Sequence, residues 1–176
     1  MSQIRVDSIV PRGGMPAGAS GGGIIQIVQT VKQDSFSASV SRTSFAAITG
    51  LSASITPSST SSKILVQFSV MTSMEGTNGA PAIILYRGGS PLSGARGTSG
   101  SSANITAGAC FGYTSNVPTG NINMLYLDSP ATTSSTTYQC YLSSDQSGSY
   151  TTAVNRNNSG SNTGYISTIT LMEITG

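Results

Sequence analysis

Short apolar runs separated by Gly, Pro and Ser dominate the chain from Ile24 onward. Several of these runs alternate apolar and polar residues with a period of two, as in Leu51, Ala53 and Ile55, which is the spacing of a half-buried β-strand. None shows the 3.6-residue apolar period of a helix. The pattern predicts strands at Ile24–Val31, Thr43–Thr49, Leu51–Thr56, Lys63–Thr72, Ala82–Arg87, Ala107–Thr114, Ile122–Leu127, Thr136–Ser143, Tyr150–Val154 and Tyr165–Ile174.

The connections between these runs carry turn residues. Examples are PSSTSS after the third run and DSPATTSS before the eighth, while Gly50 alone separates the second run from the third. Many short strands joined by such turns indicate an all-β fold, an antiparallel β-sandwich of jelly-roll type.

The last predicted strand carries apolar residues on both faces. Ile169 and Leu171 alternate on one face, and Ile166 and Met172 on the other. A strand of this kind is typical of the centre of a sheet or of a subunit contact.

The segment before Ile24 differs from the rest of the chain. Its apolar head contains Ile4, Val6, Ile9 and Val10. Pro11 and a Gly-rich stretch follow, and these residue types break helices. We therefore expect residues 1–23 to be an extended anchoring arm with a tether and residues 24–176 to be a β-sandwich head; a disordered terminus is the alternative for the arm. No repeat or heptad of a fibre shaft separates the two.

Composition excludes several classes of function. Charged residues make up 8% of the chain, and there is no His and no Trp, so imidazole-based catalysis and His-ligated metal sites are ruled out. A net charge of +2 is no electrostatic footprint for nucleic acid, and no apolar run approaches the length of a membrane helix. Ser, Thr and Gly together supply 74 of the 176 residues, which suits uncharged exposed strands and turns.

The remaining chemistry is sparse. The acidic residues Asp7, Asp34, Glu75, Asp128, Asp145 and Glu173 are scattered, so no catalytic carboxylate pair, cofactor site or metal site is predicted and the protein is not expected to be an enzyme. Cys110 and Cys140 lie in separate predicted strands. We expect both to be buried thiols without a disulfide.

Five segments together resemble a family of virion structural proteins of tailed bacteriophages, found especially in phages of cyanobacteria. They are Gly21–Ser37, Ile48–Val66, Leu127–Leu142, Val154–Asn158 and Ile166–Ile174. The resemblance covers the chain from about Gly22 to Gly176, and the region from about Met74 to Asn121 departs from it. It implies a virion component with an oligomeric, trimeric β-sandwich head.

The resemblance directs attention to apolar residues beyond the needs of one small core. Met124, Tyr126, Ile169 and Leu171 are the predicted trimer contact. Ile4, Val6, Ile9 and Val10 are the predicted anchor to the major capsid protein or another virion protein.

The leading hypothesis is a capsid decoration or cement protein on the particle surface, which binds itself as a homotrimer and attaches through the arm. One alternative is a short tail fibre or receptor-binding head, for which a host-surface glycan is a candidate partner. A second is a secreted carbohydrate-binding sandwich, disfavoured by the lack of Trp and of paired acids.

Overall fold

The structure, a computed structural model, describes residues 23–74, 80–98, 105–108, 119–157 and 164–175. Its strands are β1 (Ile24–Lys32), β2 (Phe36–Val40), β3 (Ala46–Ile55), β4 (Lys63–Met74), β5 (Pro81–Arg87), β6 (Ser90–Pro91), β7 (Ala107–Gly108), β8 (Thr119–Asp128), β9 (Thr136–Ser144), β10 (Tyr150–Val154) and β11 (Ser167–Ile174). Within these residues the only helix is a 3₁₀ turn, η1 (Ser93–Ala95). The predicted all-β class is confirmed.

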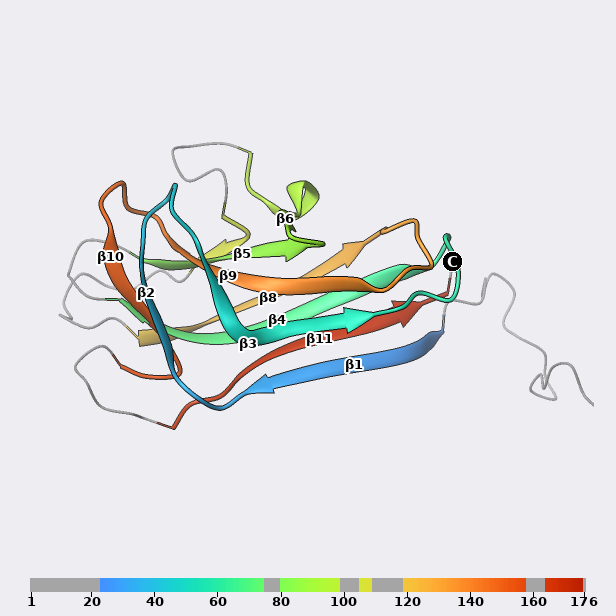
Figure 1. Cartoon of the computed structure of the whole chain (residues 1–176), viewed down its shortest axis with the longest axis horizontal. Coiled ribbons are helices and arrows are strands. Elements are labelled where there is room, and N and C mark those ends of the chain that lie inside the picture. Colours follow the sequence, from blue (N-terminus) through green and yellow to red (C-terminus); the bar gives the residue numbers. More distant parts are fainter. Residues whose placement is uncertain (1–22, 75–79, 99–104, 109–118, 158–163, 176) are drawn as a thin grey trace, which may run out of the picture.

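The strands form two sheets in which the neighbours pair antiparallel. Sheet A has the order β1-β11-β4-β10-β2, and β8 pairs with β4 as well. Sheet B has the order β3-β9-β5-β6, and β7 also pairs with β5. Figure 1 shows β8, β4, β11 and β1 side by side in one layer, with β5, β9 and β3 in the other. The chain is therefore a two-layer β-sandwich, while the jelly-roll type stays an expectation.

Alternating residues of both sheets build one core. Phe68 of β4 and Leu171 of β11 meet Leu85 of β5 and Tyr138 of β9, and each is at most 1% exposed. The period of two that predicts the strands thus also sends every second side chain into the space between the sheets.

The region around Gly50 differs from its prediction. The two predicted strands on either side of Gly50 are one strand, β3, whose pairing with β9 shifts register between Ala47 and Ser52. Gly50 has φ +79°, a left-handed conformation that glycine adopts readily and that is typical of a β-bulge. The glycine therefore kinks the strand without ending it. Strand β2, at Phe36–Val40, was not predicted.

The start of the sandwich is fastened to its last strand. The amide of Gly23 donates to the Thr175 hydroxyl at 3.1 Å, and the amide of Thr175 donates to the Gly23 carbonyl at 3.2 Å. Gly23 therefore lies at the end of the sandwich where β1 begins and β11 ends (Figure 1). The predicted anchoring residues Ile4, Val6, Ile9 and Val10 lie outside the described residues.

Candidate interaction surface

An apolar row crosses the face of sheet A that points away from the core, which we call the outer face of sheet A. The antiparallel registers align Ile27 of β1 with Met172 of β11, Met172 with Leu65 of β4, and Leu65 with Leu127 of β8. Ile27 is 62% exposed and Leu127 is 46% exposed, whereas Met172 and Leu65 are half-buried. The row is thus most exposed at its two ends, which belong to edge strands.

The same face becomes more polar from this row toward the end of the sheet where β1 ends. The next row is Gln29, Thr170, Gln67 and Leu125, and the row after it is Val31, Thr168, Ser69 and Asn123. The Gln29 amide donates to the Thr170 hydroxyl at 2.9 Å. Lys63 is the only charged side chain that the four strands β1, β11, β4 and β8 carry on this face.

Exposed aliphatic side chains are concentrated on this sheet. Across the described ranges, the exposed large hydrophobic residues lie on β1, on β8 or directly before β11, and none lies on sheet B. They are Ile24, Ile25, Ile27, Val31, Leu125, Leu127 and Ile166. Scattered exposed hydrophobics are ordinary, but a contiguous apolar patch marks an interaction site.

The structure corrects the predicted trimer contact. Ile169 and Leu171 are completely buried in the core of the single chain, so their side chains cannot reach another subunit. Met124 and Tyr126 are half-buried and pack against the same core, and their part in a contact stays a prediction. The exposed apolar residues of β8 are the alternate pair, Leu125 and Leu127, which were not predicted to form a contact.

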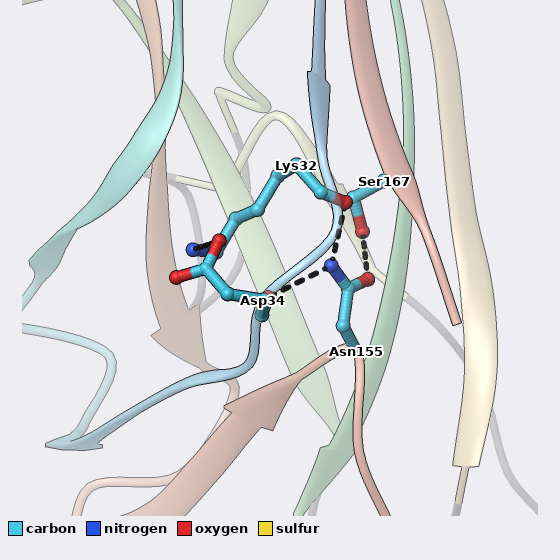
Figure 2. A network of polar contacts seen from close by, with 4 residues as sticks. All are labelled: Lys32, Asp34, Asn155 and Ser167. Atoms are coloured by element: carbon cyan, nitrogen blue, oxygen red, sulfur yellow. Dashed lines mark hydrogen bonds and ion pairs between the residues drawn. The ribbon is translucent and has the colours of Figure 1, made fainter. Parts of the chain in front are cut away.

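A polar network joins the ends of three strands (Figure 2). The Asn155 amide nitrogen donates to the carbonyl oxygens of Lys32, at 2.9 Å, and Asp34, at 3.1 Å. The Ser167 hydroxyl donates to Asn155 Oδ1 at 2.6 Å. Asn155 is 3% exposed and has φ +59°. It therefore fastens the end of β1 to the end of β10 and the start of β11.

Lys32 belongs to the same network. Its side chain is 1% exposed and its ammonium lies 2.9 Å from Asp34 Oδ1, whose own side chain is 80% exposed. The hydrogen bond from Lys32 lowers the pKa of Asp34. A hollow of about 300 Å³ beside the network is lined by Gln33, Asp34, Ser35, Asn155 and Gly164. Since the Asn155 side-chain amide forms its hydrogen bonds within the protein, we interpret the network as one that stabilises the fold.

A second polar cluster connects the two sheets. Arg87 Nη1 of β5 donates to both carboxylate oxygens of Asp128 on β8, at 2.9 and 2.7 Å. The hydroxyl of Tyr138 on β9 donates to Asp128 Oδ2 at 2.6 Å. Burial, followed by this hydrogen bond, raises the pKa of Tyr138.

The other described acids also have structural partners. Glu173 Oε1 accepts from the amide and hydroxyl of Ser58, at 2.7 and 2.6 Å, and Asp145 Oδ1 accepts from the Ala80 amide at 2.7 Å. In the part of the chain that the structure describes, no group of three or more His, Cys, Asp or Glu could hold a metal ion. The described residues also contain no helix long and apolar enough to cross a membrane.

The structure tests the prediction of a buried thiol for only one of the two cysteines. Cys140 is a free, fully buried thiol of the core, and burial raises its pKa. This agrees with its predicted role as a small hydrophobic residue. Cys110 lies outside the described residues.

Comparisons with known proteins give distant structural likenesses. No family model matches the sequence, and no curated protein matches it. A structure of infectious bursal disease virus, Gx strain, is 14% identical with a TM-score of 0.41, over 97% of this chain and 44% of that chain. A crystal structure of the VP2 subviral particle of the same virus is 11% identical with a TM-score of 0.35, over 85% of this chain and 39% of that chain. The chain spans less than half the length of these structures, and its fold is assigned from its own strand pairing.

Proposed function

We propose that this protein is a non-catalytic structural component of a virion, whose head associates with other copies and whose arm attaches it to the particle. The observation that carries the proposal is that the exposed large aliphatic side chains among the described residues lie on sheet A or directly before its strand β11. A patch of this kind suits assembly.

The acidic residues support a structural role. Asp128, Asp145 and Glu173 each accept a hydrogen bond that joins separate parts of the fold, and Asp34 accepts one from the buried Lys32 ammonium. A carboxylate used in this way stabilises the head.

The sequence resemblance supplies the particle context, namely a decoration or cement protein of a tailed-phage capsid that forms a trimer. In this proposal the arm residues Ile4, Val6, Ile9 and Val10 add as a strand to a neighbouring virion protein or fill its grooves. One arm buries few apolar groups, so attachment depends on several arms acting together through the oligomer.

The test is the position and number of copies on intact particles. We expect antibody-gold labelling to cover the capsid and quantitative mass spectrometry to find copies in the hundreds. A dozen or two copies confined to the tail would instead identify a tail fibre or receptor-binding head. Absence from purified particles would refute the virion proposal.

Attachment through the arm is tested separately. A variant with Ile4, Val6, Ile9 and Val10 all changed to Ser should remain folded but no longer bind particles stripped of the native protein. Undiminished occupancy by this variant would show that the head alone provides the attachment.

A further inference from the structure

We infer that the outer face of sheet A binds a second copy of this chain head-to-tail, with the β1 margin of one copy against the β8 margin of the next. This inference deepens the proposed function, because it names the surface through which the copies associate.

The exposed area of the face suits a closed ring of copies. In a ring each copy uses both margins, one against each neighbour, so the seven exposed aliphatic side chains, at on the order of 100 Å² each, approach the roughly 800 Å² that each partner buries in a standard interface. Ordinary surface variation on a monomer gives apolar patches of a few hundred Å². The patch is therefore large enough for the occupant to be another folded surface.

The charge distribution favours a second copy. Like charges on the two margins of this face would oppose a contact between them. The four strands present only Lys63 on this face, and their polar side chains include the amides and hydroxyls of Gln29, Gln67 and Thr170. These groups both donate and accept hydrogen bonds, so they can pair with the same types on another copy.

The placement of the exposed residues favours a head-to-tail contact. Ile27 on β1 and Leu127 on β8 are at opposite margins of the four-strand face, and the more buried Met172 and Leu65 lie between them. In a face-to-face pair the centre of the patch would be the natural hot spot. Exposure at two separate margins instead suits a heterologous contact, which closes into a ring when the rotation permits.

The test uses the full-length protein and light scattering coupled to size exclusion. The wild type should elute at a multiple of its 17.9 kDa mass, with three copies as the expected number. Ile27→Lys and Leu127→Lys should each fall to the mass of one chain. The matched control is Thr137→Lys, which places the same charge at an exposed position of sheet B and should keep the wild-type mass.

Mixing the two lysine variants tests the head-to-tail arrangement. Each variant retains one intact margin, so the mixture should form a one-to-one heterodimer at twice the single-chain mass. A face-to-face contact would bring altered margins into every pairing, and no heterodimer would form. That outcome would overturn the arrangement.

Further controls separate loss of contact from loss of folding. Circular dichroism of each variant should match the wild type, and Leu127→Ser provides a milder change with the same expected fall in mass. The inference is overturned if the wild type is a monomer at about 50 µM, or if folded lysine variants keep the wild-type mass. It is also overturned if mass falls only when the four apolar arm residues are changed to Ser, because the arm would then be the occupant. None of these results depends on binding to particles.

Discussion

Tyr138 of sheet B donates a hydrogen bond of 2.6 Å to Asp128 of sheet A, at a point where both residues are at most 5% exposed. The Asp128 carboxylate also accepts hydrogen bonds from Arg87 Nη1, so it has partners from two strands of the opposite sheet. The contact holds β8, an edge strand of the proposed interface, against the rest of the sandwich.

Removal of the Tyr138 hydroxyl should destabilise the head. Tyr138→Phe keeps the ring in the core but takes one partner from a buried carboxylate, which we expect to lower the free energy of unfolding by about 1–3 kcal/mol. Urea denaturation measures this change. Tyr150→Phe, at a partly exposed tyrosine of β10, is the control and should change stability much less; equal effects would contradict the role of the Asp128 contact.

Glu173 should make stability depend on acidic pH. The hydrogen bonds from Ser58 lower its pKa in the folded state, so the unfolded chain binds the proton more tightly. The contribution of Glu173 is therefore present above its unfolded pKa of about 4.3 and is lost as the pH falls through its lower folded pKa. Urea denaturation at a series of pH values should show a shallower loss of stability between pH 5 and pH 2 for Glu173→Gln than for the wild type. Parallel curves would contradict the prediction.

Asn155 combines a hydrogen-bonding role with a strained backbone, and two substitutions separate these contributions. Asn155→Ala and Asn155→Gly both remove the amide that holds the Lys32 and Asp34 carbonyls, at a cost of about 1–3 kcal/mol. Alanine additionally has to adopt the left-handed conformation, which costs about 1–2 kcal/mol more than for glycine. Thermal unfolding should therefore rank the wild type above the glycine variant and the glycine variant above the alanine variant. Equal stability of the two variants would show that the backbone conformation contributes nothing.

The Cys140 thiol should not react with thiol reagents in the folded protein. Its thiol is completely buried and its pKa is raised, so little thiolate is available to react. In a Cys110→Ser background, an aromatic disulfide reagent should label no thiol under native conditions and one thiol in denaturant. Rapid labelling of the native protein would mean that the core around β9 opens readily.

Period-two alternation was sufficient to predict most of the strands, because side-chain direction in a strand is a local property. It did not identify Phe36–Val40, whose inward residues Phe36, Ala38 and Val40 supply a short and weakly apolar pattern. It also treated Gly50 as a strand end, although the pairing with β9 continues past the bulge.

The candidate surface was harder to predict than the fold. Strand β8 is apolar on both faces, with Met124 and Tyr126 on one side and Leu125 and Leu127 on the other. Which pair faces inward is decided by the register against β4, and this long-range information is not contained in the strand itself. A shift of one residue exchanges the buried and exposed sets. The last strand is apolar on both faces as well, and its core residues Ile169 and Leu171 were for that reason predicted to lie in the contact.

The two hydrogen bonds between Gly23 and Thr175 have a consequence for engineering. Cargo joined after Thr175 would lie beside Gly23, on the side where the proposed arm would attach the protein. The β9–β10 connection at residues 145–149 lies at the opposite end of the sandwich (Figure 1), so a foreign peptide inserted there would be displayed away from that side. Insertion at this turn, rather than terminal fusion, is the better design for using the protein as a display scaffold.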